Sequence, residues 1–392
     1  MIIGDVDDPY PRIHELMKTG SVHEVNYPDL FSVGVDPTLA PYKHFTVFGY
    51  NAISEILSHP EIFTQEAFRH NLGRSFGRSI TTMDPPEHTQ YRKIFQKAFL
   101  PQNVAKWGEK LVDPVVRKLT DPLIARGYGD LIQEFTIHYP FQVVFGMMAL
   151  PKEDQVTFHK LATAQSVFPV SVEISVEAGR KLGAYLQDLL ALRRAEPGDD
   201  IVSALAVAEA DGERLPDEVV VSFFRQLLAA GGDTTYRGTS VLLTGLLTNP
   251  DQLAAVMADH DLIPQAIEEA LRWNSPVAHG FRWVAKDTVL DGVAMPAGSV
   301  IDMILGSANR DPERFPDPDK FDIFRPHPAK HIAFASGPHI CIGQHLARLE
   351  MKRALTSILE RMPRLRLDPD MSPPRIKGIT LRVPKHLYVR CD

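Results

Sequence analysis

The longest helical pattern in the chain covers residues 216–248, and it constrains the possible folds more than any other feature. Pro216 suits a first helical residue, Asp217 suits the positive end of the helix dipole, and Asn249-Pro250 ends the pattern. At 1.5 Å per residue, such a helix is about 50 Å long. The sequence therefore predicts one helix long enough to cross the whole domain.

The centre of this predicted helix carries unusually small residues. Ala230-Gly231-Gly232 is followed directly by Asp233-Thr234. Each glycine inside a helix costs roughly 1 kcal/mol relative to alanine, so the pair needs a reason. The glycines indicate either a kink or tight crossing with another helix, or a place where a large group presses against the backbone. This segment alone leaves both interpretations open.

The remaining sequence pattern is mostly helical, with apolar residues recurring at helical spacing between residues 51 and 274. Strand patterns lie near the two ends of the chain, at residues 43–48, 280–284, 299–305 and 379–389. Because strands and helices do not alternate, a doubly wound parallel sheet is disfavoured. The sequence has no linker, repeat or low-complexity segment. It predicts one mainly α domain with small β-sheets over residues 1–392.

Composition limits the class of protein. Apolar residues make up 44% and charged residues 23%, which is ordinary for a soluble globular chain. The formal charge of −7 argues against nucleic acid as a general partner. The nearly apolar run at residues 141–150 is too short to span a bilayer, and the N-terminus does not resemble a signal peptide. We therefore expect a cytoplasmic protein with no membrane partner.

Two cysteines are present, so the chain has no disulfide framework. Cys391 is the penultimate residue, whereas Cys341 lies between Gly337 and Gly343, directly before an amphipathic helical pattern. A thiolate at a helix N-terminus is stabilised by backbone amides, and it suits iron as a soft ligand. The two glycines would let the backbone approach a flat macrocycle. Taken alone, the segment fits a buried cysteine, a zinc ligand beside nearby histidines, or a nucleophile.

The whole segment around this cysteine is more specific than the cysteine itself. It reads Phe334-Ala335-Ser336-Gly337-Pro338-His339-Ile340-Cys341-Ile342-Gly343. This decapeptide resembles the haem-binding loop of the cytochrome P450 superfamily, whose pattern is Phe-x-x-Gly-x-His/Arg-x-Cys-x-Gly. Ala335 and Gln344 depart from bacterial members, which usually carry glycine and alanine at those positions.

Five other segments resemble motifs of the same family, in the family's order, so that the resemblance covers essentially the full chain. They are the haem-facing segment 83–92, the oxygen-activating stretch 230–235, the pair Glu269 and Arg272, and the runs 308–312 and 321–326. The resemblance implies a cytochrome P450 fold with the long central helix crossing over the haem. It also implies a haem-thiolate monooxygenase of the soluble bacterial type that contains haem b.

The resemblance assigns roles to individual residues. It implies that Cys341 binds the iron and that Asp233 and Thr234 form the acid–alcohol pair of oxygen activation. Ala230 and Thr234 are four residues apart, so both can face the haem. The implied haem-binding residues are His88, Arg92, Ala230, Arg282, Phe334, His339, Cys341 and Gly343. For Asp233 and His88, an ordinary surface position is the alternative.

Two further expectations follow from the family pattern. The pair Glu269 and Arg272 should be buried and structural, joined by Arg325. The substrate pocket should include Phe68, Leu72, Phe76, Val167, Phe168, Val170 and Ala230. These apolar side chains indicate a medium-sized apolar substrate.

The chain carries no dinucleotide fingerprint or P-loop. Electrons should therefore come from a ferredoxin and an NAD(P)H-dependent ferredoxin reductase, and we expect a monomer. The docking face could consist of Arg92, Lys93, Lys97, Arg348, Lys352 and Arg353, although an ordinary solvated face explains these charges equally well. A peroxide-using haem enzyme and a non-catalytic haem sensor are the competing functions. The Asp233-Thr234 pair argues against both.

Overall fold

The computed structural model describes residues 6–34, 36–166, 171–210 and 212–392. Its helices are α1 (Tyr10–Met17), α2 (Tyr50–Ser58), α3 (Glu66–His70), α4 (Gly73–Phe76), α5 (Glu87–Ala98), α6 (Pro101–Trp107), α7 (Asp113–Arg126), α8 (Tyr139–Met147), α9 (Gln155–Gln165), α10 (Val172–Ala195), α11 (Ile201–Ala206), α12 (Asp217–Leu247), α13 (Pro250–Ala258), α14 (Ile263–Trp273), α15 (Leu305–Ala308) and α16 (Gln344–Arg361).

The strands are short and lie mostly near the two ends of the sequence. They are β1 (Val22–His23), β2 (His44–Val47), β3 (Phe63–Thr64), β4 (Tyr128–Asp130), β5 (Glu209–Ala210), β6 (Glu213–Arg214), β7 (Gly280–Val284), β8 (Thr288–Leu290), β9 (Val293–Met295), β10 (Val300–Met303), β11 (Arg366–Leu367), β12 (Ile376–Lys377), β13 (Val383–Pro384) and β14 (Tyr388–Arg390). The mainly α architecture with small sheets is confirmed.

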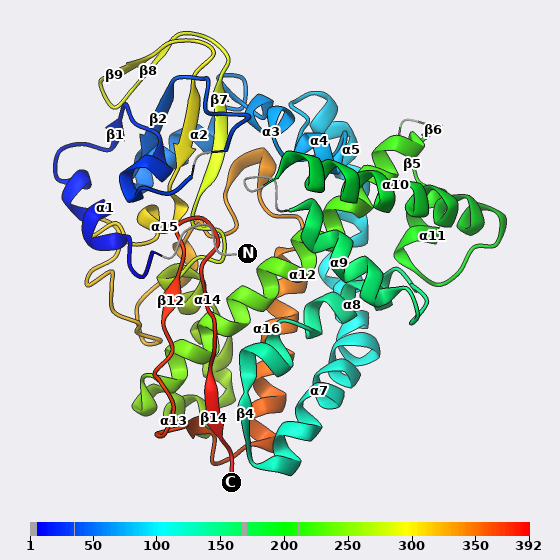
Figure 1. Ribbon diagram of the computed structural model, residues 1–392, viewed down its shortest axis with the longest axis vertical. Coiled ribbons are helices and arrows are strands. Elements are labelled where there is room, and N and C mark those ends of the chain that lie inside the picture. The colour runs from blue at the N-terminus through cyan, green and yellow to red at the C-terminus, as the bar shows by residue number, and fades with distance from the viewer. Residues whose placement is uncertain (1–5, 35, 167–170, 211) are drawn as a thin grey trace.

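The largest sheet has the strand order β1-β2-β10-β7-β3 and lies with α1 and α2 on one side of the molecule (Figure 1). Strand β10 pairs in parallel with β2 and antiparallel with β7, which aligns Ile301 with Phe45 and Arg282. The strands predicted at 43–48, 280–284 and 299–305 are therefore confirmed. The strand predicted at 379–389 is wrong as one element. It divides into β13 and β14, which belong to different sheets, and Pro384 has no backbone N–H to continue the ladder.

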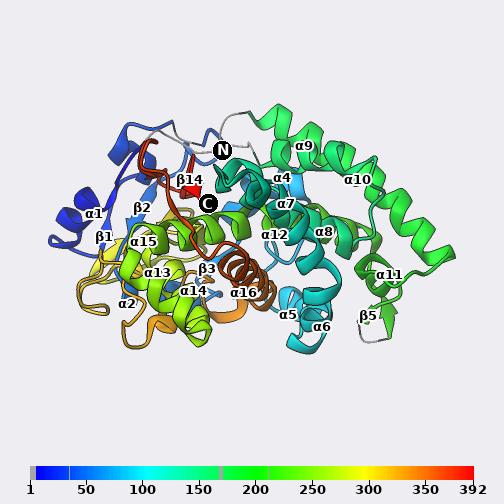
Figure 2. The same ribbon diagram turned by 90° about the horizontal axis from the view of Figure 1, so that it is seen from below.

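Helix α12 is the predicted central helix, and Figures 1 and 2 both place it in the middle of the molecule. Most of its side chains are buried, and it packs against α8, α10, α14 and α16. A helix that is apolar around its circumference belongs in a protein core. Pro216 is the residue before the helix rather than its first residue, because its ψ of 136° is extended.

The two glycines of α12 allow α8 to pack closely. A Cβ atom at Gly231 would lie 2.9 Å from a methyl carbon of Val144, and one at Gly232 would lie 2.5 Å from the ring of Phe141. Both distances are shorter than real Cβ contacts, so larger residues would force the helices apart. The interpretation as a tight helix crossing is confirmed for this side of α12.

A buried charge cluster holds α14 against the segment that precedes the cysteine loop. Arg272 donates to both carboxylate oxygens of Glu269, at 2.7 and 2.8 Å, and Arg325 lies 3.3 Å from the same carboxylate. Arg272 also donates to the backbone carbonyls of Asn309 and Pro318. The expected structural role of this group is confirmed, since its side chains are almost fully buried and join three segments.

Candidate functional site

A cavity of about 330 Å³ lies between the middle of α12 and the cysteine loop. Its described walls are mostly apolar and include Phe99, Phe223, Leu227 and Met303. Nine of the predicted site residues line it, namely Phe68, Arg92, Ala230, Thr234, Arg282, Phe334, His339, Cys341 and Gly343. Residues far apart in the sequence therefore meet around one cavity, as expected of a ligand site.

The other predicted site residues are not among those that line this cavity. His88 is buried behind the wall, with its ring 3.9 Å from that of His339, so the surface alternative for His88 is wrong. Leu72 and Phe76 belong to the short segment around α4, which packs on α10, and they are not among the described lining residues. Val167, Phe168 and Val170 lie outside the described residues.

The cysteine loop has a tightly determined backbone. The N–H of Cys341 donates to the carbonyl of Phe334 at 2.8 Å, which closes the loop. Gly337 has a φ of +69°, and a Cβ atom there would lie 2.2 Å from the carbonyl oxygen of Leu57. Glycine is therefore required at Gly337 by both conformation and contact. Ala335 also has a positive φ, +59°, where the family usually has glycine.

The thiol of Cys341 faces the cavity, and its surroundings have opposing effects on its pKa. Burial raises its pKa, whereas a hydrogen bond from the Gly343 backbone N–H and the charges of Arg92 and Arg348 lower it. Burial dominates, so the net shift of the free thiol is upward, although the backbone N–H of Gly343 lowers the pKa in the direction expected of amides at this position. Helix α16 begins only at Gln344, three residues later. A metal that binds the sulfur deprotonates it regardless of these effects.

Four basic side chains gather at one end of the cavity: Arg92, Arg282, His88 and His339. Burial lowers the pKa of Arg282 to about 10, and burial together with Arg92 lowers that of His88 to about 4. Burial, His88 and the two arginines lower the pKa of His339 to about 2. None of the four has an ion pair with a carboxylate in the described chain, and ring nitrogens of both histidines lack partners there. The group is suited to an anion with several acceptor oxygens.

Asp233 and Thr234 face different surroundings although they are adjacent. The Thr234 hydroxyl donates to the carbonyl of Ala230 at 2.7 Å and lies on the cavity wall. Asp233 does not line the cavity. Its carboxylate accepts hydrogen bonds from Arg237 at 2.8 and 3.1 Å. Arg237 is the residue that sequence reasoning missed, and the only signal was its spacing of four from an acid on a helix.

The side chain of Gln344, where bacterial members usually carry alanine, contacts Arg348. Its side-chain oxygen accepts a hydrogen bond from Arg348 at 3.1 Å, and Arg348 also forms a two-point ion pair with Glu268. The guanidinium of Arg348 lies 4.4 Å from the centre of the Phe334 ring. Gln344 therefore helps to hold Arg348 over the phenylalanine of the cysteine loop.

Of the six basic residues predicted for the docking face, Arg92 lines the cavity, and the other five divide into two groups. Arg348 and Arg353 are engaged by Glu268 and Asp113. The other group, Lys93, Lys97 and Lys352, is exposed and forms no ion pair with any described residue.

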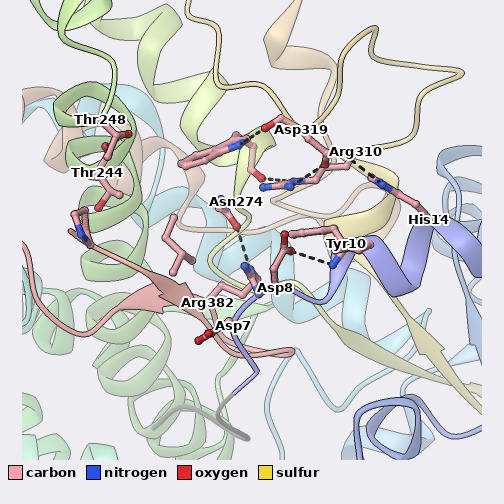
Figure 3. A pocket seen from close by; sticks show the side chains of 14 residues that line it. Asp7, Asp8, Tyr10, His14, Thr244, Thr248, Asn274, Arg310, Asp319 and Arg382 are labelled. Atoms are coloured by element: carbon pink, nitrogen blue, oxygen red, sulfur yellow. Dashed lines mark hydrogen bonds and ion pairs between the residues drawn. The ribbon is translucent and has the colours of Figure 1, made fainter. Parts of the chain in front are cut away.

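A second pocket, of about 390 Å³, lies between α1, the end of α12 and the C-terminal segment (Figure 3). The ring of Tyr10 lies 3.7 Å from the guanidinium of Arg310 and 5.1 Å from that of Arg382. Asp319 pairs with Arg310, and Asp8 lies in the same pocket, so opposite charges are mixed there. None of its described lining residues lines the first cavity.

The geometry agrees with three comparisons with known proteins. The family model described as Cytochrome P450 matches residues 173–389. Cytochrome P450 107B1 of Saccharopolyspora erythraea is 39% identical over 300 residues, which cover 76% of this chain and 73% of that protein. The cytochrome P450 monooxygenase PikC of Streptomyces venezuelae is 34% identical over 377 residues, which cover 92% of this chain and 85% of that protein.

Solved structures show the same likeness across the fold. CYP109E1 from Bacillus megaterium in complex with testosterone has a TM-score of 0.85 at 28% identity, covering 98% of this chain and 99% of that one. CYP109Q5 from Chondromyces apiculatus has a TM-score of 0.85 at 31% identity, with coverage of 98% and 95%. In the described parts of this chain, no helix combines the length and apolar character needed to cross a membrane.

Proposed function

The chain belongs to the cytochrome P450 family of haem-dependent monooxygenases, and from this premise we propose that it oxidises a medium-sized apolar substrate with electrons from an external ferredoxin. As a member of that family it is an oxidoreductase that binds haem b. The observation that carries the proposal is that Cys341 and Thr234 line one largely apolar cavity from two different walls.

The described residues fit a haem. Its two propionates would supply the carboxylates that the buried group of Arg92, Arg282, His88 and His339 lacks. The thiolate of Cys341 would bind the iron, with Phe334, Gly343 and Ala230 against the macrocycle. A Cβ atom at Gly343 would meet no protein atom within 4 Å, so protein packing alone does not explain glycine there. When bound, thiolate-ligated haem supplies the capacity to cleave the O–O bond of O2.

The protein's own contribution is proton handling in an apolar space. Thr234 presents a hydroxyl to the cavity without bringing a charge into it, and it is suited to hold a water molecule there. Asp233 is the adjacent acid and would supply protons to that hydroxyl. Because O2 reduction consumes protons inside a largely apolar cavity, both residues would raise the share of electrons that forms product.

The character of the walls supports an apolar substrate. Phe68, Phe99, Phe223 and Leu227 contribute apolar surface to the cavity, and its described walls contain no carboxylate. Such a surface favours hydrocarbon groups over charged ones. In the related structure of CYP109E1, the ligand named is testosterone, a compound of the size and polarity that we propose for this chain.

We further propose a cytoplasmic monomer in which residues 1–392 form one domain. The electron donor would be a ferredoxin served by an NAD(P)H-dependent reductase. Lys93, Lys97 and Lys352 are suited to meet an acidic ferredoxin, since their charges are exposed and not engaged by any described carboxylate.

Two measurements test this function. The reduced CO complex should show the red-shifted Soret band of thiolate ligation. Cys341→His should lose this band and Cys391→Ser should keep it, and the reverse result would refute the ligand assignment. With a surrogate ferredoxin system and 18O2, a substrate found by its spectral shift should gain one 18O atom. Product formation with peroxide alone and none with the ferredoxin system would instead establish a peroxide-using enzyme.

A further inference from the structure

In the second pocket, between α1, the end of α12 and the C-terminal segment, the arginines are buried and the acids are exposed (Figure 3). Arg310 and Arg382 line it with only 5% and 3% of their surface exposed. By contrast, the side chains of Asp7 and Asp319 are 55% and 56% exposed, and Asp8 is exposed as well. The pocket therefore has positive charge at its floor and negative charge at its rim.

Hydrogen bonds hold both guanidinium groups in place and leave part of each one unused. Arg382 donates from Nε to the side-chain oxygen of Asn274 at 3.0 Å and from Nη1 to a backbone carbonyl. Arg310 donates from Nε to the carbonyl of Trp273 at 2.7 Å and from Nη1 to Asp319 at 2.9 Å. Neither Nη2 atom, nor the side-chain nitrogen of Asn274, donates to a described residue. Three pocket residues thus keep donors that suit an anion.

The three carboxylates of the pocket differ in their partners. Asp319 lies 2.9 Å from Arg310, and Asp7 lies 2.8 Å from Lys377. Asp8 forms no ion pair within the parts of the chain that the structure describes, and it accepts only one backbone N–H, at 3.1 Å. Asp8 is therefore the acid of this pocket whose charge is available to a cation from outside.

Arg382 is the complementary cation. It forms no ion pair with any described carboxylate, although a buried charge without a counterion is unfavourable. Tyr10 contacts both unpaired groups. Its ring lies 5.1 Å from the Arg382 guanidinium, and its backbone N–H is the one that donates to Asp8. One small molecule with an anionic and a cationic group can therefore reach both.

The pocket also has room and apolar surface for the rest of such a molecule. Its volume of about 390 Å³ lies within the range of small-molecule sites. Pro11, Trp273, Pro374 and Ile376 contribute apolar atoms to its wall. A ligand with one hydrocarbon group beside its two charges would match all three parts of the wall.

We propose that the second pocket binds a free α-amino acid with an apolar side chain. The carboxylate of the amino acid accepts hydrogen bonds from Nη2 of Arg382, Nη2 of Arg310 and the amide nitrogen of Asn274. Its ammonium group meets the carboxylate of Asp8. Its side chain lies against the apolar part of the wall, which includes Ile376.

This site is separate from the place of oxidation. Thr244 of the second pocket follows Thr234 by 10 residues on α12, a distance of about 15 Å along the helix. The described lining residues of the pocket and of the cavity do not overlap. The amino acid is therefore a bound ligand and not a second substrate, and the inference does not depend on the substrate proposed above.

Three compounds with the same phenyl group separate the contributions of the two charges. L-Phenylalanine carries both charges, 3-phenylpropionate carries only the carboxylate, and 2-phenylethylamine carries only the ammonium group. Each is titrated by calorimetry into the haem-loaded protein at pH 7 and low salt. We expect L-phenylalanine to bind on the order of tenfold more tightly than either other compound, since each charged contact adds to its affinity. It should leave the Soret band unchanged.

Two variants assign each charge to its partner. Asp8→Asn removes the negative charge but keeps an oxygen for the Tyr10 N–H, so it should weaken L-phenylalanine and 2-phenylethylamine on the order of tenfold and not weaken 3-phenylpropionate. Arg382→Gln should weaken the two carboxylates and not the amine. Lys385→Gln, at an exposed position after β13, should match the wild type. If Arg382→Gln does not fold, Asp8→Asn and the three compounds still decide.

NMR of the ferrous-CO protein with 13C-labelled isoleucine methyl groups identifies the place of binding. Ile376 lines the second pocket, whereas Ile80 and Ile340 line the cavity. L-Phenylalanine should shift the Ile376 signal and leave the other two unchanged. Shifts confined to Ile80 and Ile340 would place the compound in the cavity and overturn the inference.

The binding data can contradict the inference in two further ways. Absence of saturable L-phenylalanine binding up to about 10 mM would reject the site. Equal affinity for L-phenylalanine and 3-phenylpropionate, unchanged in Asp8→Asn, would make the pocket a site for anions and reject the amino acid as its ligand. Weaker L-phenylalanine binding in Asp8→Asn, with wild-type binding in Lys385→Gln and a shift at Ile376, supports the proposal.

Discussion

The carboxylate of Asp233 accepts two hydrogen bonds from Arg237, one helical turn later on α12, and the arginine is completely buried. One nitrogen of that guanidinium, Nη1, has no partner in the described chain. Asp233 is therefore the carboxylate that balances a buried positive charge, in addition to its proposed role in proton supply. A substitution at Asp233 consequently changes stability as well as chemistry.

This relationship predicts that Asp233→Asn destabilises the fold by about 2 kcal/mol. Removing one partner of a buried ion pair costs about 3–5 kcal/mol, and the partial exposure of Asp233 reduces that figure. Urea unfolding of the holoprotein at pH 7 measures the change. The double variant Asp233→Asn/Arg237→Met, which removes both charges, should recover most of the loss. Equal stability of the wild type and Asp233→Asn would show that the ion pair with Arg237 contributes nothing to the stability of the fold.

Thr234→Ala should uncouple the enzyme rather than abolish electron flow. Alanine is well tolerated within a helix, so haem content and substrate affinity should stay nearly unchanged. Without the hydroxyl, more of the electrons should leave as hydrogen peroxide. Product and peroxide are measured per NAD(P)H consumed, with Thr234→Ser, which keeps the hydroxyl, as the control. Full coupling in Thr234→Ala would rule out the proposed role.

The ferredoxin contact should depend on exposed lysines. Lys93→Glu and Lys97→Glu reverse charges that no described carboxylate neutralises, so each should slow reduction by an acidic ferredoxin at low salt and have less effect at high salt. Stopped-flow reduction at two ionic strengths measures this. Lys385→Glu, on the segment between β13 and β14, is the matched surface control. Equal rates in all variants at low salt would exclude this docking face.

The sequence predicted those features that depend on local pattern. The extent of α12 followed from its apolar repeat and from Asn249-Pro250, and the shape of the cysteine loop followed from its glycines. The burial of Glu269 and Arg272 required the family pattern, because pairs at this spacing are common on helix surfaces. The strand at 379–389 was predicted as continuous because alternation of apolar residues does not reveal which partner each half has.

The contacts around Asp233 were not predictable in the same way. A spacing of four between Asp233 and Arg237 is compatible with an exposed pair, and burial depends on what packs over the helix. Phe141 comes from another helix, α8. Its position against Gly232 results from the tight helix crossing, whose partner a single sequence does not identify.

A buried cluster around Asp302, on the central strand β10 of the large sheet, predicts a specific pH dependence of stability. Asp302 accepts from His44 at 2.8 Å and from His279 at 2.9 Å. The second ring nitrogen of His44 lies 3.0 Å from the carbonyl of Leu39, so both nitrogens face acceptors. Burial lowers the pKa of His44, but its bond to Asp302 and that charge outweigh burial, and the net shift is upward. The histidine bonds hold the pKa of Asp302 below its ordinary value against the effect of burial.

The two shifts act in opposite pH ranges. The raised pKa of His44 gives stability that is fully present below about pH 6.5 and is lost as pH rises through the folded-state value. The lowered pKa of Asp302 gives stability that is present above about pH 3.9 and is lost as pH falls through its folded-state value. Unfolding of the wild type and Asp302→Asn is compared from pH 5 to 8.5. The advantage of the wild type should decrease toward pH 8.5, and a constant difference would contradict this account of His44.

Ala335 should be a position at which glycine improves stability. Its φ of +59° is the left-handed conformation, which costs an alanine about 1 kcal/mol or more relative to glycine. The larger entropy of glycine in the unfolded chain offsets part of this gain, so Ala335→Gly should stabilise the fold by roughly 0.5–1 kcal/mol. Ala149→Gly, at a φ of +48°, should act in the same direction. Ala184→Gly, at an exposed position inside α10, should destabilise by about 1 kcal/mol. If urea unfolding shows a loss for Ala335→Gly as large as that for Ala184→Gly, contacts of the Ala335 methyl group with the neighbouring core outweigh the backbone strain.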